Sequence, residues 1–157
     1  MLFIGIDPGQ SGGLAGIDEL GLVVTTLKMP ETEQDLLNAL RDFREHANHG
    51  YVRAVLERVS AGVFGANRRM GVTSAFTFGR GVGALRMALT AAEIPFDEVA
   101  PVKWQTAMMC RTRGDKNISK RRAQQLFPQV KVTHAIADCL LLAEYCRREE
   151  RVRRGAA

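Results

Sequence analysis

Two acidic residues stand at the ends of apolar segments that have the length of buried strands. Asp7 follows residues 2–6, and the turn after it contains Pro8 and several glycines, which let the backbone approach a ligand closely. Glu57 ends a second such segment, residues 51–56. A buried carboxylate costs several kcal/mol or more unless a cation or hydrogen-bond donors satisfy it, so the repeated pattern favours a cation site. Capping of the turn by the Asp7 side chain is the alternative for that residue.

A third acid, Asp138, is the single charged residue in the apolar stretch 135–143. If this stretch is helical, His134 lies on the same helix face as Asp138, because residues four apart are neighbours there. In open α/β sheets, ligands gather at the carboxyl ends of the strands. Asp7, Glu57, Asp138 and His134 are therefore predicted to converge on one or two divalent cations, and oxygen-rich ligation favours Mg²⁺ or Mn²⁺.

The segments that must position these residues alternate between strand and helix patterns. Strands are expected over 2–7, 14–18 and 22–28, joined as an antiparallel meander by turns that contain glycine. A helix over 33–47, capped by Thr32, precedes the strand that ends at Glu57, so this strand is expected to return parallel to the first. A helix over 74–93, a strand near 96–100 and helices over 102–108, 118–126 and around Asp138 complete an α/β plan.

The long helix expected over 74–93 contains three glycines, Gly79, Gly81 and Gly83. Each costs a helix interior about 1 kcal/mol relative to alanine, so three of them indicate close approach of the backbone to a partner element or a substrate. A helix that begins later in the segment is the alternative.

The positive charge of the protein is concentrated in one segment. The whole chain has a net charge of +5, whereas residues 101–127 alone have +6, from seven basic side chains against the single acid Asp115. The basic residues are Lys103, Arg111, Arg113, Lys116, Lys120, Arg121 and Arg122. A basic segment near metal-binding acids suits a polyanionic substrate such as nucleic acid, and a solvated surface is the alternative. The arginine-rich stretch 147–154 is weaker evidence, because a fraying helix end has the same composition.

The length of 157 residues is that of one domain, with residues from about 147 onward as a basic tail that frays. The chain has no run of 18 apolar residues and no signal-peptide pattern, so no membrane association is expected. Cys110, Cys139 and Cys146 lack metal-ligand spacing, and the last two lie about two helical turns apart, too far for a disulfide. These features are typical of a reduced cytoplasmic protein.

Several motifs, in their order and spacing, resemble landmarks of the RuvC-like Holliday junction resolvases, particularly the compact bacteriophage and prophage type. The motifs are residues 5–9 around Asp7, Glu57, residues 73–76 with 78–81, residues 99–104, and residues 137–144 around Asp138. The resemblance covers nearly the whole chain. It implies a ribonuclease H-like α/β fold, in which a mixed five-stranded sheet is flanked by helices on both faces, a homodimer, and a bacterial or phage-infected host cell.

The same resemblance implies magnesium-dependent nicking of two symmetric strands at a four-way DNA junction, and so a role in DNA recombination and repair. In two-metal chemistry, Asp7 would bridge both ions, Glu57, His134 and Asp138 would share the remaining positions, and Lys116 would stabilise the pentavalent phosphorus. The family usually offers four acids, two of them on the last helix, and this chain has His134 at the first of those two places. The lost negative charge favours Mn²⁺ over Mg²⁺, and a structural histidine that caps the helix start is the alternative.

Two further residues are expected at the DNA. Phe64 is an apolar residue in the glycine-rich loop after Glu57, where it either packs as core or wedges against unstacked bases at the junction centre. Arg80 belongs to one of the family-like motifs and is expected to bind DNA. Two rival functions remain: a module of the same fold that binds junctions without cutting them, and a phosphate-binding domain of the actin or sugar-kinase type.

Overall fold

The computed structural model describes residues 1–48, 50–59, 71–111 and 115–156. Five strands form one mixed sheet in the order β3-β2-β1-β4-β5. β1 (Leu2–Asp7), β2 (Gly13–Asp18) and β3 (Val23–Lys28) form an antiparallel meander. β4 (Val52–Glu57) pairs parallel with β1, and β5 (Phe96–Val99) pairs parallel with β4. The expected meander and the parallel return of the strand that ends at Glu57 are confirmed.

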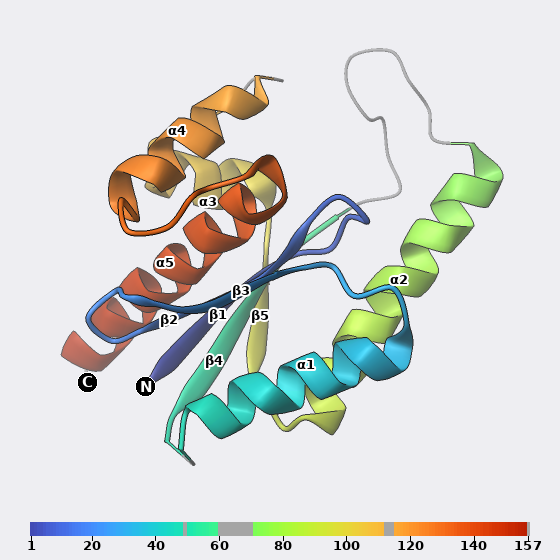
Figure 1. Cartoon of the computed structure of the whole chain (residues 1–157), viewed down its shortest axis with the longest axis horizontal. Helices are drawn as coiled ribbons and strands as arrows, with labels where there is room; N and C mark the ends of the chain where they lie inside the picture. Colours follow the sequence, from blue (N-terminus) through green and yellow to red (C-terminus); the bar gives the residue numbers. More distant parts are fainter. Residues whose placement is uncertain (49, 60–70, 112–114, 157) are drawn as a thin grey trace.

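Five helices cover the two faces of this sheet (Figure 1). α1 (Glu33–His46) and α2 (Val72–Ala91) pack on one face, and the Thr32 hydroxyl caps α1 by accepting the Asp35 N–H at 3.1 Å, as expected. α3 (Pro101–Ala107), α4 (Lys116–Leu126) and α5 (His134–Gly155) pack on the other face. The predicted fold class, a mixed five-stranded sheet between two helical layers, is confirmed.

Each face of the sheet has its own hydrophobic core, because successive side chains of a strand point to opposite faces. In β1, Leu2, Ile4 and Ile6 join the core with α1 and α2, whereas Phe3 joins the core with α5. Gly5 lies on the α5 side, where an added Cβ would stand 2.0 Å from the Cys139 carbonyl oxygen. The missing side chain therefore lets α5 lie directly on β1.

The helix expected over 74–93 is confirmed as α2, and the alternative of a late start is wrong, because the helix begins at Val72. Gly79, Gly81 and Gly83 are therefore interior residues of the helix. A Cβ added at any of the three would meet no atom of the described chain within 4 Å. No other element of the described chain approaches the helix at these glycines. The free-energy cost of glycine in a helix interior is therefore not offset by a close backbone contact within the described chain.

The expected fraying of residues from about 147 onward is wrong up to Gly155, where α5 ends. The arginines of this segment pair with acids one turn earlier, since Arg147 and Arg148 contact Glu144 at 2.7 Å and Arg154 contacts Glu150 at 3.2 Å. All three cysteines are free and buried, as expected. Among the described residues, no helix is both long and apolar enough to cross a membrane.

Candidate active site

The sheet and α5 bring three acids to one edge of the molecule. Asp7 and Glu57 are the last residues of neighbouring parallel strands, whose register pairs Ile6 with Leu56. Asp7 follows Phe3 and Gly5 in the alternation of β1, and Glu57 follows Val55 in that of β4, so both point to the face covered by α5. Asp138 approaches from the first turns of α5.

Asp7 is held in a tight turn. The Gly9 N–H donates to its Oδ1 at 3.4 Å, so the Asp7 side chain does cap the turn, but through a long hydrogen bond. A Cβ at Gly12 would stand 2.6 Å from the Asp7 Cγ, so only glycine lets the turn close against the carboxylate. Burial, with the Asp138 charge as the second cause, raises the pKa of Asp7 from 3.8 to about 6, against the opposing effects of Gly9 and Lys116.

Glu57 is oriented by a buried tryptophan. The Trp104 indole Nε1–H donates to the Glu57 Oε1 at 2.9 Å, and Trp104 itself is fully buried in the α5-side core. Burial raises the pKa of Glu57 from 4.5 to about 7, and the nearby charges of Asp7 and Asp138 add to this shift although the tryptophan hydrogen bond opposes it. The second oxygen of Glu57 stays available to a ligand.

Asp138 lies between α5 and α4. Burial raises the pKa of its carboxyl group, and a hydrogen bond with Ser119 together with the charges of Lys116 and His134 opposes the rise. Its Oδ1 is buried and has no hydrogen-bond partner among the described residues. A native protein rarely leaves a buried polar oxygen unpaired, and a bound ion or water is one of the accepted explanations.

The three carboxylates are close enough that Asp138 raises the pKa of the other two. Within the described ranges, no three His, Cys, Asp or Glu side chains stand close enough together to form a finished metal-binding group. The donor set nevertheless fits a divalent cation, because it offers only carboxylate oxygens, one of them unpaired, and because a cation would offset their mutual repulsion.

His134 and Lys116 both lie near this acidic cluster. His134 is the first residue of α5 and is exposed, and its charge acts on Asp138 one turn later. The N-cap position belongs to Thr133, so the alternative of a capping histidine is wrong. Lys116 begins α4 and lowers the pKa of Asp7 and of Asp138, which places its ammonium group within electrostatic reach of both.

The remaining predicted DNA-binding residues fall into three groups. Arg111 and Arg121 are exposed around α4, and Lys120 is half-buried. Arg122 is engaged within the protein, since its Nε–H donates to the Met108 carbonyl oxygen at 3.0 Å, and this contact ties α4 to the end of α3. Arg80 is exposed on α2, on the opposite side of the sheet. Phe64 and Arg113 lie outside the described residues, so their predicted roles stay predictions.

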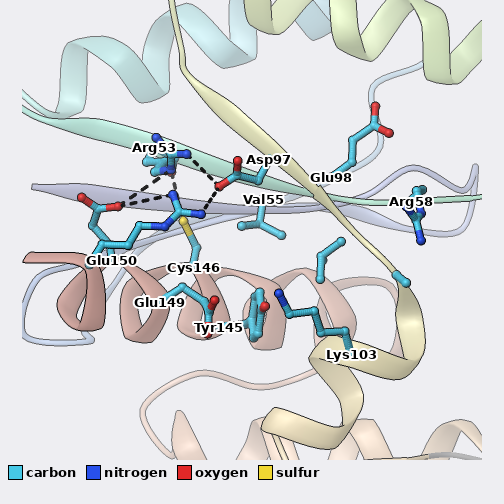
Figure 2. A pocket seen from close by; sticks show the side chains of 13 residues that line it. Arg53, Val55, Arg58, Asp97, Glu98, Lys103, Tyr145, Cys146, Glu149 and Glu150 are labelled. Atoms are coloured by element: carbon cyan, nitrogen blue, oxygen red, sulfur yellow. Dashed lines mark hydrogen bonds and ion pairs between the residues drawn. The ribbon is translucent and has the colours of Figure 1, made fainter. Parts of the chain in front are cut away.

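Lys103 lies in a separate groove of about 270 Å³ along the edge strand β5 (Figure 2). In this groove, Arg53 contacts Asp97 at 2.7 Å and Glu150 at 3.8 Å. The positive charge of Arg53 is thus largely neutralised by acids of the same chain. Lys103, Arg58 and Arg153 are the exposed basic residues of its lining, and Arg153 is paired with Asp97 at 3.0 Å.

Three positioning residues were not singled out from the sequence. Gly12 packs on Asp7, Trp104 holds Glu57, and Ser119 contacts Asp138. The signal for Trp104 is chemical, because a buried tryptophan needs an acceptor for its N–H. Gly12 belongs to the glycine-containing turn directly after Asp7, so its signal is local. Ser119 has no comparable signal, because its partner Asp138 is distant in the sequence.

The class of fold defined by this sheet and its flanking helices is ribonuclease H-like, of the kind found in RuvC. The chain is similar to the Thermus thermophilus RuvC structure, with 16% sequence identity and a TM-score of 0.66 over 99% of this chain and 97% of that one. It is also similar to T. thermophilus RuvC in complex with Holliday junction substrate, with 18% identity and a TM-score of 0.60 over 99% and 96% of the two chains. No protein-family model and no curated protein matches the sequence. The likeness confirms the expected RuvC-like fold, while membership of the bacteriophage type stays a prediction.

Proposed function

We propose that this chain is a divalent-metal-dependent endonuclease that resolves four-way or branched DNA junctions by paired nicks, with residues 1–157 as one nuclease domain. One observation carries the proposal: Asp7, Glu57 and Asp138 meet at the carboxyl edge of a RuvC-like sheet, where Asp138 keeps a buried oxygen without a partner. A structural cluster of acids would be paired with cations of the chain. One of the similar structures is bound to a Holliday junction substrate, which supports the choice of DNA.

The acids and His134 would hold Mg²⁺ or Mn²⁺, which when bound supplies a Lewis acid for the scissile phosphate and lowers the pKa of the attacking water. Asp7, in the middle of the edge, is the residue to bridge two ions, with Glu57, Asp138 and His134 in the remaining positions. Trp104 keeps Glu57 aimed at the site by its hydrogen bond. Lys116, which acts on Asp7 and Asp138, is placed to offset negative charge that develops on the phosphate.

Paired nicks require a twofold dimer, and α2 offers a surface for it. Val72, Phe76 and Met87 are 89%, 73% and 63% exposed, and helical periodicity puts them on one face with Gly79 and Gly83. Large apolar side chains exposed around glycines suit close packing of a second copy. We expect Gly83→Leu to weaken the dimer in sedimentation, and a monomeric unaltered chain, with and without junction DNA, would refute the assembly.

The runner-up function is junction binding without cleavage, and the observation that favours it is His134 at the place of an acid. Titration of Mg²⁺ and Mn²⁺ against a labelled four-way junction separates the candidates. Paired nicks support the proposed nuclease, binding without nicks supports the runner-up, and binding of nucleotide in place of DNA would support the phosphate-binding domain. A linear duplex of the same length is the control for structure selectivity.

A further inference from the structure

A cleft of about 560 Å³ lies on the other side of the active-site edge, between α2, the start of α1 and the turn after β1. Gln10 and Ser11 of that turn line the cleft, and they lie only three and four residues after Asp7 in the chain. The cleft therefore opens beside the segment that carries the first catalytic carboxylate. Nothing in the proposed nuclease chemistry uses it.

The cleft has an apolar floor and a polar rim. Leu36 and Leu85 in the floor are buried, and Met29 and Ala84 beside them are half-buried. The rim residues have hydroxyl or amide side chains, are exposed, and make no side-chain hydrogen bond within the described part of the chain. They are Gln10, Ser11, Thr73, Ser74 and Thr77. An apolar slot with a few uncommitted donors and acceptors at its mouth is typical of a small-ligand site.

The charges at the mouth restrict what the ligand can be. Among the described residues that line the cleft, Glu31 and Glu33 stand against the single cation Arg80, so this part of the mouth has a net negative charge. A phosphate group is therefore disfavoured in the slot. A nucleobase fits instead, because its flat face suits the apolar floor and its exocyclic amino and ring N–H groups can donate to carboxylates and hydroxyls.

The glycines of α2 divide between two faces of the helix. At about 100° per residue, Gly79 and Gly83 fall on the exposed stripe with Phe76, whereas Gly81 points to the opposite side and lines the cleft. A Cβ at Gly81 would meet nothing within 4 Å, so its side of the helix is open space. The cost of this third glycine is explained if the space must stay empty for a ligand. The cleft also stays open when a second copy covers the stripe.

We propose that this cleft binds one unstacked nucleobase of the DNA strand that is cut, next to the scissile phosphate. The inference rests on the proposed nuclease function and adds a substrate contact to it. A base drawn out of the stack is available at a branch point at lower cost than within a duplex. Seating that base beside the Asp7 turn would fix the position of the adjoining phosphate at the carboxylates, and so favour junctions over intact duplex.

The test uses four-way junctions in which 2-aminopurine replaces, one at a time, the bases that flank the nick mapped with the unaltered chain. Binding is measured with the Asp138→Asn chain, which is expected to bind without cutting. We expect a severalfold rise of fluorescence at one position, as that base leaves the stack, and its loss when Gly81→Leu fills the cleft. No rise at any position, or an undiminished rise with Gly81→Leu, would overturn the inference.

Gly81→Ala is the matched control, because it restricts the helix backbone as leucine does but adds only one methyl group. It should keep most of the fluorescence rise, and an equal loss with alanine and leucine would assign the effect to helix stiffness and overturn the inference. Gly81→Leu should unfold at the same temperature as the unaltered chain or higher, sediment identically, and cut junctions at least about tenfold more slowly. Thr77→Leu narrows the cleft from another position and should lose the signal too.

Failure of this inference is distinct from failure of the proposed function. If the unaltered chain neither binds nor cuts junctions, the nuclease proposal fails. If it cuts them and both Gly81→Leu and Thr77→Leu cut equally well, only the base-binding cleft is refuted.

Discussion

Helix α5 buries acidic side chains in both of its halves, but the two halves treat them in opposite ways. In the second half, Glu144 is 4% exposed and accepts hydrogen bonds from Arg147 and Arg148 at 2.7 Å. Burial alone would raise the pKa of Glu144, but these two arginines outweigh it and lower the pKa. In the first half, the pKa of Asp138 is raised by burial, and its Oδ1 lacks a partner in the described chain.

The difference separates structural acids from functional ones on a single helix. Glu144 is paired with Arg147 and Arg148 through both of its carboxylate oxygens. This pairing holds the second half of α5 in place and leaves no unpaired oxygen for a ligand. Asp138 is buried at a net cost, together with Asp7 and Glu57, and no cation of the described chain forms a salt bridge with any of the three. A protein keeps such a costly arrangement at a functional site, where a bound cation offsets it.

The strongest test of this contrast exchanges one acid in each half for its amide. Asp138→Asn removes a predicted metal ligand, so we expect cleavage below a few per cent of the original rate, with fold and junction binding retained; Asp7→Asn and Glu57→Gln should behave alike. Glu144→Gln instead removes the carboxylate that accepts hydrogen bonds from half-buried Arg147 and exposed Arg148, and should cost on the order of 2 kcal/mol of stability with cleavage per folded molecule unchanged. Junction cleavage assays and thermal unfolding on both variants decide the matter. Residual cleavage by Asp138→Asn above that level would disprove the assigned site.

The contrast also predicts how stability depends on pH without metal. Asp7 and Glu57 lose their protons near pH 4 in the unfolded chain, but keep them until their raised pKa values of about 6 and about 7 in the folded one. Between pH 4 and 7 the folded state binds more protons than the unfolded state. The stability of the metal-free protein should therefore fall as the pH rises through this window, by roughly a few kcal/mol. Mg²⁺ or Mn²⁺ should therefore raise the melting temperature by several degrees at pH 8 and by little at pH 5. Melting curves in chelator and in metal measure this, and equal metal effects at both pH values would contradict it.

A smaller effect is expected at His134, which is proposed to hold metal as a fourth ligand beside Asp7, Glu57 and Asp138. His134→Asp restores a fourth carboxylate, so we expect cleavage in Mg²⁺ to gain relative to cleavage in Mn²⁺ by several-fold. The measurement is the ratio of the two cleavage rates at saturating metal. His134→Ala, which should fold normally because this side chain is exposed, is the control for simple loss of the imidazole. An unchanged ratio in His134→Asp would mean that His134 does not contact the metal.

The acids at the strand ends are the part of this site that could be predicted from the sequence. The sequence places Asp7 and Glu57 at the tips of apolar strands, and the alternation of side chains then sends both toward α5. The i, i+4 spacing of His134 and Asp138 is equally local. Trp104 and Ser119 could not be assigned in this way, because each supports an acid from a different element and their meeting is a product of tertiary packing.

One alternative for α2 and one expectation for the end of the chain were wrong, and both have physical reasons. Glycine propensity made a late start of α2 the alternative, but its buried residues, Leu85, Ala88 and Leu89, pack against the sheet and stabilise the helix despite its glycines. Composition argued for a frayed tail after residue 147, but spacings of three and four residues pair its arginines with Glu144 and Glu150. In both cases long-range or pairwise contacts outweighed intrinsic tendency.

The smallest expected effect concerns the basic segment around α4, whose charges would position DNA without taking part in the chemistry. Arg111 is exposed and forms no ion pair within the described chain, in contrast to Arg122, which is tied to the Met108 carbonyl oxygen. Each phosphate contact that is lost reduces the slope of log affinity against log salt by about one. Changing Arg111 and Arg113 together to alanine should therefore flatten the slope by roughly two.

Binding of this double variant to junction and to duplex should weaken by the same factor, because phosphate contacts carry no structural or sequence information of their own. Arg122→Ala is the matched control: it should lower the melting temperature, because it frees the end of α3, and change the salt slope less. Fluorescence anisotropy over a range of salt concentrations gives both quantities. An unchanged slope in the double variant would mean that these arginines form a solvated surface, and the DNA path would then follow Lys120 and Arg121 or the arginines at the end of α5.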